Sequence, residues 1–370
     1  MANRTPLYDR HVALGARMVD FGGWDMPQQY TSIKDEHLAV RRAAGLFDVS
    51  HMGRLNVVGD GASDFLNMVV TNDVSQLEAG HAQYNLMCNE AGGVIDDLVI
   101  YKSSATDFIV VVNASNREKD VAWLRSHLPK GASMEDRTRD VSLIAFQGPR
   151  AEELLPRGTS DTTGIPYFGF TKGSIAGAEG HISRTGYTGE DGFELFVPTA
   201  HVGEVWDAIL QNGKSAGVLP AGLGARDACR LEAALRLWGN DMDETVNAYE
   251  AGLGWTVKLD KGDFIGREAL LKAKESGPAR RMVGLSMKPG DIPRHGTAVL
   301  KAGTRIGTVT SGTHSFFLEH PIALALVEGP SLRAGDVVAV DVRGREAPAE
   351  VTKLPFYRGS AHSVTAPARN

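Results

Sequence analysis

Two adjacent carboxylates, Asp96 and Asp97, stand in an apolar segment where charged side chains are costly to bury. The segment reads GGVIDDLVIY (92–101), and its β-branched and apolar residues behind a Gly-Gly turn predict a largely buried strand. Because successive strand side chains face opposite ways, both acids can point into one cavity only if a bulge intervenes. We expect one acid to face a site and the other to tie down a loop. The residues alone also allow both acids to accept hydrogen bonds from backbone amides after the turn.

A second polar group lies in GYTGEDGFE (186–194), where we expect a hairpin with a Gly-Glu-Asp-Gly turn. Tyr187 and Glu194 would lie on its two arms, and so short a turn would bring them side by side on one wall. The alternative is a solvated acidic turn. That reading explains the acids at the tip better than it explains Glu194, which precedes an apolar run.

The third group is a pair of arginines in GLGARDACRLEAAL. Arg226 and Arg230 fall one turn apart near the start of an expected helix, where basic residues oppose the helix dipole at a cost of up to about 1 kcal/mol. We therefore expect the arginines to have an acidic partner that offsets this cost. Either Asp227 or Glu232 provides one, or Arg226 faces a carboxylate of a ligand or of Glu194.

The composition excludes several classes of protein. A length of 370 residues predicts two or three domains, and a net charge of −6 without a long Lys/Arg run argues against nucleic-acid or membrane-surface binding. The signatures GxxxxGK[ST], strand-linked GxGxxG, HExxH and GxSxG are missing, which argues against NTPases, dinucleotide oxidoreductases, zinc enzymes and serine hydrolases.

The two cysteines, Cys88 and Cys229, stand alone in the sequence. Their isolation indicates a reducing compartment and no zinc site. The N-terminus carries no apolar core of signal-peptide length, and no run of apolar residues is long enough to span a membrane. We therefore expect a cytoplasmic protein.

Helices and antiparallel strands are intermixed without regular βαβ units, which predicts an α+β fold. Residues 82–113 show three apolar segments separated by turn signals, as in a meander. The helices that we expect are 33–45, 62–74, 116–128 with Ser115 or Asn116 as cap, one from Arg150, 201–217 and 225–239.

After about residue 281 the helical signal ends. Six short strands spaced by Gly and Pro follow, which predicts a small β-barrel or sandwich. The joint is expected in the polar segment 270–281.

Seven stretches, found in the order in which one family carries them, resemble the aminomethyltransferases, the T-proteins of the glycine cleavage system. DVSHM (48–52) and VNASNREKD (112–120) add to this resemblance, which covers nearly the whole chain. The seven stretches are TPLYDRHVALGARMVDFGGWDMP, GGVIDDLVIY, RTGYTGEDGFE, GLGARDACRLEA, KGDFIGREAL, GTVTSG and PFYR.

The resemblance implies a three-domain cloverleaf around a central folate cavity. Residues 1–280 would form a folate-binding region of two intertwined α+β domains, and 281–370 the C-terminal β-barrel. The implied enzyme of glycine catabolism moves a one-carbon unit from the aminomethyl-lipoyl arm of the H-protein to tetrahydrofolate, its acceptor substrate. Methylenetetrahydrofolate, ammonia and the dihydrolipoyl carrier result, and no metal, nucleic acid or membrane takes part.

The resemblance also implies roles for single residues. Asp97 would lie by the reactive pterin nitrogen, with Asp96 as the competing assignment. Glu194 would bind the amino-pyrimidine edge, Arg226 would line the pterin site, and Arg358 of PFYR would reach the glutamate tail. The other implied cavity walls are Tyr84, Tyr101, Asn113, Tyr187, Trp238 and Trp255.

These roles agree with simple chemistry. A fixed carboxylate can accept two N–H groups of a planar pterin edge, and an arginine suits an anionic tail. An ionised aspartate would stabilise the cationic aminomethyl group and the iminium-like carbon that develops, and could steer a proton to the departing ammonia.

Three alternatives stay open. A folate-dependent demethylase of the same fold would act on a methylated sulfonium or amine. A folate-binding protein linked to iron–sulfur assembly would carry Lys-Gly-Cys, whereas KGDFIGRE has Asp263 in place of the cysteine. A globular protein with an empty pocket is the third.

Overall fold

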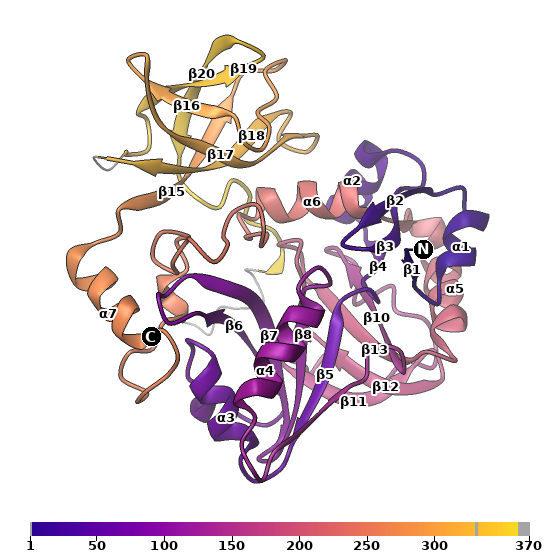
Figure 1. Cartoon of the computed structure of the whole chain (residues 1–370). Helices are drawn as coiled ribbons and strands as arrows, with labels where there is room; N and C mark the ends of the chain where they lie inside the picture. The colour runs from indigo at the N-terminus through magenta and orange to yellow at the C-terminus, as the bar shows by residue number, and fades with distance from the viewer. Residues whose placement is uncertain (1, 330–331, 362–370) are drawn as a thin grey trace, which may run out of the picture.

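Two β-sheets pack against each other through a shared apolar core in the part of the chain that precedes the barrel (Figure 1). The computed structural model describes residues 2–329 and 332–361. Tyr101 and Val111 of one sheet and Phe47, Ala145 and Phe196 of the other belong to this core. The α+β class is confirmed.

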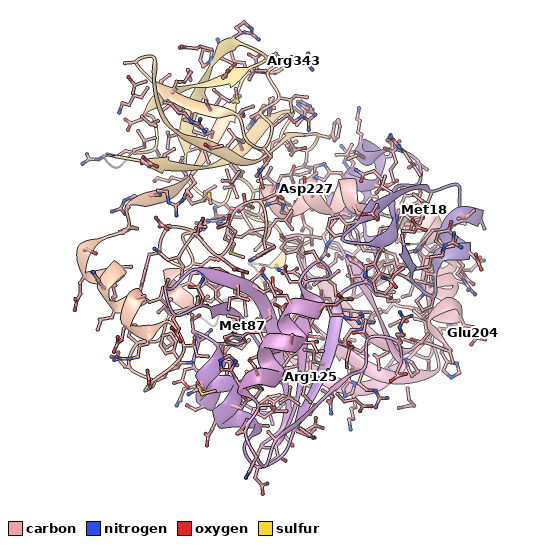
Figure 2. All side chains as sticks on the ribbon, in the orientation of Figure 1. Met18, Met87, Arg125, Glu204, Asp227 and Arg343 are labelled. Atoms are coloured by element: carbon pink, nitrogen blue, oxygen red, sulfur yellow. The ribbon has the colours of Figure 1, made fainter. Side chains whose placement is uncertain are left out.

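The first of these sheets has five antiparallel strands in the order β6-β7-β8-β5-β9. Helices α3 (Ala62–Val69) and α4 (Arg117–His127) cover its outer face, where Phe65 and Leu124 are buried. Met87 lies in the apolar core between this sheet and the two helices, whereas Arg125 of α4 is exposed (Figure 2). The strands are β5 (Gly53–Val58), β6 (His81–Cys88), β7 (Val94–Ser104), β8 (Asp107–Val112) and β9 (Ser133–Asp136), so the predicted meander is confirmed.

The second sheet has six strands in the order β11-β12-β13-β10-β4-β14. Trp206 of α5 (Val202–Gly213) packs on its outer face, whereas α2 (Ile33–Arg42) and α6 (Leu223–Glu232) contribute to the shared core. The strands are β4 (Gly45–Asp48), β10 (Val141–Gln147), β11 (Phe170–Ile175), β12 (Ala178–Ser183), β13 (Gly192–Pro198) and β14 (Leu219–Pro220).

Short elements complete this part of the chain. A three-stranded sheet in the order β1-β3-β2 lies near the N-terminus, and three 3₁₀ turns occur in connections. The elements are β1 (Asn3–Arg4), α1 (Tyr8–Ala13), β2 (Arg17–Phe21), β3 (Trp24–Gln29), η1 (Val74–Gln76), η2 (Lys214–Ala216) and η3 (Gly254–Thr256).

A closed barrel follows helix α7 (Arg267–Ser276) and stands apart from both sheets (Figure 1). Its alternating Val, Leu and Ala side chains fill the interior, so the strands predicted from 281 onward are confirmed as a barrel. Residues 330–331 and 362–370 of that predicted range lie outside the described residues. The strands are β15 (Arg280–Met287), β16 (Ala298–Lys301), β17 (Thr304–Ser315), β18 (His320–Glu328), β19 (Val337–Val342) and β20 (Arg345–Thr352).

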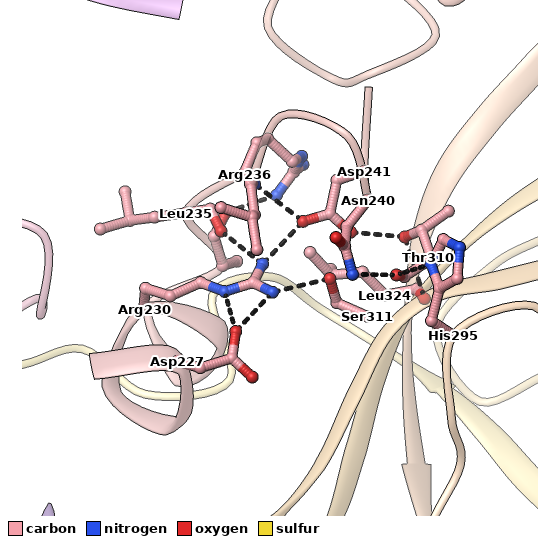
Figure 3. Close-up of polar contacts among 12 residues, drawn as sticks. Asp227, Arg230, Leu235, Arg236, Asn240, Asp241, His295, Thr310, Ser311 and Leu324 are labelled. Carbon is pink, nitrogen blue, oxygen red and sulfur yellow. Dashed lines mark hydrogen bonds and ion pairs between the residues drawn. The ribbon is translucent and has the colours of Figure 1, made fainter. Parts of the chain in front are cut away.

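A buried polar network joins the barrel to α6 (Figure 3). The guanidinium of Arg230 donates to Asp241 at 2.6 Å and to the hydroxyl of Ser311 in β17 at 2.7 Å. Asp241 also accepts the hydroxyl proton of Thr310 at 2.5 Å. The barrel is therefore held by directional bonds as well as by apolar contacts.

Several predicted helices are shorter in the structure. The helix predicted over 62–74 ends at Val69, because Val70 takes an extended backbone, and those over 33–45 and 201–217 end at Arg42 and Gly213.

Only a single turn forms after Arg150, because Pro156 lacks an amide hydrogen and disfavours helical backbone before it. Helix α6 ends at Glu232 and not near residue 239, since Ala234 adopts a left-handed φ of 56°.

Among residues 2–329 and 332–361, no helix is both long and apolar enough to cross a membrane. Cys88 and Cys229 are both free and buried.

Candidate functional site

Strands β6 and β7 present the two acids beside a bulge. Asp97 pairs with Leu86 and Asp96 with Met87, and the register then shifts so that Val94 pairs with Cys88. Ile95 is the extra residue of this irregularity, which bends the strand just before the acids. Gly93 leads into the strand at a point where a Cβ would lie 1.8 Å from the carbonyl oxygen of Glu244, so only glycine fits.

Asp96 is fully buried and ties the loop between β8 and α4 to strand β7. Its carboxylate accepts the backbone N–H of Asn113 at 3.1 Å, the Asn113 side-chain amide at 2.8 Å and the Asn116 amide at 2.7 Å. Asn116 occupies the N-cap position of α4, but its side chain makes no capping hydrogen bond because it donates to Asp96. Asn116 is thus the N-cap residue, as one of the two expected candidates, but it caps without a side-chain hydrogen bond.

Asp97 is half-buried and its carboxylate is held from two sides. The hydroxyl of Tyr84 donates to one oxygen at 3.0 Å, and the amide of Asn113 donates to the other at 2.9 Å. Burial and the neighbouring Asp96 raise the pKa of Asp97 to about 7, although these two hydrogen bonds favour the ionised form. The group can thus gain or lose a proton near neutral pH.

Two tryptophans contact the strands that carry Asp97 and its partner Tyr84. Trp255 stacks on Tyr84 with ring centroids 6.0 Å apart, and it is 59% exposed, so it forms the solvent side of the group. Trp238 lies at the start of β7, where its indole N–H donates to the carbonyl of Val94 at 2.9 Å. The ammonium of Lys119 lies 4.1 Å from the centre of a Trp238 ring.

Glu194 lies on the other sheet and is reached by Tyr101 of β7 across the shared core. The Tyr101 hydroxyl donates to Oε2 of Glu194 at 3.1 Å, and the Thr185 hydroxyl donates to the same oxygen at 2.5 Å. Oε1 accepts no hydrogen bond from the described residues. The half-buried carboxylate therefore keeps one oxygen for another donor.

Arg226 and Tyr187 form a contact on which the charges of both acids act. The Arg226 guanidinium lies 4.7 Å from the centre of the Tyr187 ring, and burial lowers the pKa of Arg226 although Tyr187 and Glu194 favour its charge. The pKa of Tyr187 is raised by burial, with Asp97 and Arg226 among the charges that act on it. Asp97 and Glu194 are thus linked electrostatically through this pair, and we call the four residues the polar cluster.

The predicted hairpin differs in one respect. Ser183 pairs with Glu194, so the strands end at residues 183 and 192 and Tyr187 lies in the connecting loop and not on an arm. The loop is longer than predicted because Arg184 is held by Asp191 and leaves the ladder.

Arg358 lies on the segment after the barrel and is exposed. The segment runs along the same loop, since the amide of Ser360 donates to Glu190 at 2.9 Å and the amide of Ala361 donates to Gly189 at 3.3 Å. Within the described part of the chain, Arg358 makes no hydrogen bond or ion pair, so the structure does not join it to the polar cluster.

Sequence reasoning missed Thr185, which binds Glu194, and the role of Asn116. Thr185 ends a mostly polar stretch, HISRT, and Asn116 follows shortly after a buried strand. A polar residue next to a buried strand is therefore the sequence feature that could have indicated both residues.

Two surface hollows lie elsewhere. One of about 410 Å³ is bordered by Asp241, Arg280 and Arg305, and another of about 870 Å³ by Trp123, His127 and Asp263. None of the predicted site residues lines either hollow.

Comparison with known proteins covers almost the whole chain. The GCVT N-terminal domain model matches residues 7–261, and the glycine cleavage T-protein C-terminal barrel domain model matches residues 280–358. An aminomethyltransferase of Thermotoga petrophila is 51% identical over 96% of this chain and 98% of its own length. The aminomethyltransferase of Geobacillus kaustophilus is 47% identical over 97% and 99%.

A solved structure agrees with these matches. The glycine cleavage system aminomethyltransferase T from Bartonella henselae superposes with a TM-score of 0.91 at 32% identity, covering 97% of this chain and 99% of that chain. The resemblance carried by the seven sequence stretches is thus confirmed. The chain is a transferase that belongs to the aminomethyltransferase family, the T-proteins of the glycine cleavage system.

Proposed function

We propose that this aminomethyltransferase moves the one-carbon unit from the aminomethyl-lipoyl arm of the H-protein to tetrahydrofolate. The methylene carbon gains bonds to two folate nitrogens and loses its bonds to sulfur and to the amine. The two folate N–H protons leave with those groups, so the products are 5,10-methylenetetrahydrofolate, ammonia and the dihydrolipoyl carrier. The observation that carries this proposal is the half-buried Asp97 carboxylate held by Tyr84 and Asn113 in a chain of this family.

Asp97 is the proposed catalytic residue. The transferred aminomethyl group is cationic, and an ionised carboxylate beside it stabilises positive charge in the transition state. With a pKa of about 7, Asp97 can also pass a proton to the departing ammonia. Asp96 is less suited to this role because Asn113 and Asn116 occupy its oxygens, and we propose that it orients the loop.

Glu194 is the proposed pterin anchor. Its free Oε1 and its buried Oε2 can together accept neighbouring N–H groups of a planar amino-pyrimidine edge. Tyr101 and Thr185 hold the carboxylate in place, and Arg226 and Tyr187 would form the adjoining wall. These residues fit a folate, and all belong to the region 1–280, which we propose as the folate-binding unit.

The remaining assignments concern the edge of the site. Trp255 and Trp238 would flank the bound substrates, and the exposed Arg358 would meet the anionic glutamate tail. We place the reaction in the cytoplasm, and the free thiols of Cys88 and Cys229 support a reducing compartment.

A direct assay tests the proposal. Purified protein is incubated with tetrahydrofolate and H-protein bearing the aminomethyl-lipoyl arm, and methylenetetrahydrofolate and ammonia are measured. We expect equal amounts of both products. A methylated sulfonium or amine that is turned over in place of the lipoyl arm would instead establish the demethylase alternative, which the aminomethyltransferase relatives do not favour.

A further inference from the structure

Asp120, in the first turn of α4, is a buried acid without a hydrogen-bond donor. It is 0% exposed, and neither of its carboxyl oxygens has a donor among the described residues. Its polar neighbour is Asp96 of β7, to which it is linked through Asn116: the Asp120 backbone amide donates to the Asn116 carbonyl at 2.8 Å, and the Asn116 side chain donates to Asp96 at 2.7 Å. The side chain of Asp96 also acts directly on the carboxyl group of Asp120. Two ionised carboxylates only repel each other, so this contact is favourable only when one of them carries a proton.

The proton belongs on Asp120 and not on Asp96. Asp96 accepts three N–H groups, two from Asn113 and one from Asn116, at 2.7 to 3.1 Å, which is the environment of an ionised carboxylate. Asp120 accepts none. Burial and the charge of Asp96 raise the pKa of Asp120 well above the ordinary range of an aspartate.

The other charges around the pair do not reverse this assignment. Asp97 adds a further negative charge, and Lys119 adds a positive one. The ammonium of Lys119 is bound to the carbonyl of Ile95 at 2.9 Å and to Glu244 at 2.9 Å, and its side chain is 37% exposed. The helix N-terminus favours an anion, but the contribution of one helix end is modest against full burial beside a carboxylate.

The Asp96 carboxylate is linked directly to the proposed catalytic acid. The side-chain amide of Asn113 donates to Asp96 at 2.8 Å and to Asp97 at 2.9 Å, so a displacement of Asp96 moves the group that holds Asp97. We propose that Asp120 is a positioning residue that stays protonated and donates a hydrogen bond to Asp96. This bond fixes the Asp96 carboxylate, which in turn holds the Asn113 amide in the position from which it orients Asp97. This inference rests on the proposed role of Asp97.

Two substitutions distinguish whether Asp120 acts as a hydrogen-bond donor or only fills space in the core. Asp120→Asn keeps a donor of the same shape and cannot ionise, so we expect turnover close to that of the wild type. Asp120→Leu fills the space without a donor, and we expect kcat to fall roughly 10- to 100-fold with an unchanged KM for tetrahydrofolate. Equal activities of the leucine variant and the wild type, or an asparagine variant as weak as the leucine variant, would overturn the positioning role.

The protonated state has a readout that needs no activity. Protein labelled with ¹³C-aspartate is measured by infrared spectroscopy at about pH 8, where ordinary aspartates are ionised. Asp97→Asn is used as background, so that Asp97 cannot contribute to the signal. We expect a carboxylic-acid carbonyl band that disappears when Asp120→Asn is added. Absence of the band from the Asp97→Asn protein would show that Asp120 is ionised and would overturn the inference.

Stability provides a second check, because folding takes up a proton at Asp120. The unfolded side chain ionises at its ordinary pKa, so the stability that this group contributes is lost as pH rises toward its raised folded pKa. We therefore expect the Tm of Asp120→Asn to rise relative to the wild type as pH increases. A pH-independent difference contradicts the inference. The infrared band and this trend report the protonation of Asp120 and do not depend on the activity of Asp97. If Asp97→Asn proved fully active, the proposed function of Asp97 would fail while both of these readouts persisted, so the two failures can be told apart.

Discussion

Asp97 combines a buried position with two hydrogen bonds that favour its charge, and these opposing effects leave its pKa at about 7. A carboxylate in this balance can act both as an electrostatic partner of a cation and as a proton carrier. Asp96, one residue away, has its oxygens occupied by amides and fixes a loop. The two adjacent residues are both aspartates, so the difference between their proposed roles comes from the groups that surround each carboxylate.

The first prediction follows from that difference. Asp97→Asn should lower kcat by roughly 10²-fold or more, because a transition-state charge is lost, and should leave folate affinity within a few-fold. Asp96→Asn should mainly lower the free energy of unfolding, since it weakens the bonds to Asn113 and Asn116. Steady-state kinetics and chemical denaturation measure the two effects. If the phenotypes are exchanged, the two acids have been assigned in the wrong order.

The pH dependence gives the second prediction. Asp97 must be ionised to stabilise the transferred cation, so kcat/KM should rise as pH increases through about 7. The raised folded pKa also means that folding takes up a proton there, so the stability contributed by Asp97 is lost as pH rises through about 7. Both trends should vanish in Asp97→Asn. A wild-type profile that is flat across this range would exclude Asp97 as the titrating group.

At the scale of elements, the site depends on how the two sheets face each other. Glu194 is placed on β13 by its pairing with Ala145 of β10 and Ser183 of β12. Tyr101 comes from β7 of the other sheet and meets Glu194 because both side chains point into the shared interior. A carboxylate on one sheet is therefore oriented by a hydroxyl from the other.

This arrangement predicts a binding defect in Glu194→Ala. Loss of a charged acceptor should weaken tetrahydrofolate binding by about 1.5–3 kcal/mol, which calorimetry measures directly. Tyr101→Phe should cause a smaller loss, because the carboxylate remains and only one of its two hydroxyl donors is removed. Glu153→Ala, at an exposed ion pair with Arg150, is a matched control that should bind normally. Normal binding by Glu194→Ala would remove this residue from the folate site.

At the scale of the whole molecule, the barrel is joined to the sheets through Arg230 and Asp241 (Figure 3). Arg230 has two ion-pair partners: Asp241, which is buried, and Asp227, whose side chain is 47% exposed. Because Asp241 also binds Thr310 of β17, its carboxylate connects α6 to the barrel. Figure 2 shows Asp227, a residue of α6, at the same junction, where the helix faces the barrel.

Asp241→Ala should therefore destabilise the protein by about 3–5 kcal/mol, because it leaves the Arg230 guanidinium buried without its buried carboxylate partner. Asp227→Ala removes the more exposed partner of the same arginine and should cost about 1 kcal/mol or less. Chemical denaturation of the two variants measures the difference. Equal losses of stability would show that the buried pair does not determine how the barrel is held.

The sequence by itself determined the features that depend on neighbouring residues. The six barrel strands and helix α4 follow from local hydrophobic periodicity and turn residues, and the family follows from short motifs in a fixed order. The buried run around Asp96 and Asp97 was also evident, because two acids in an apolar strand conflict with its pattern. Such features require no knowledge of distant contacts.

Only the tertiary structure decided which partner each buried polar side chain binds. It moved Tyr187 into a loop and directed the side chain of Asn116, the N-cap residue of α4, to Asp96. It also placed Asp120 beside Asp96 and Tyr101 beside Glu194. The physical reason is that a buried polar group takes whichever partner the packing of sheets and helices brings within reach, and local sequence patterns do not encode that choice.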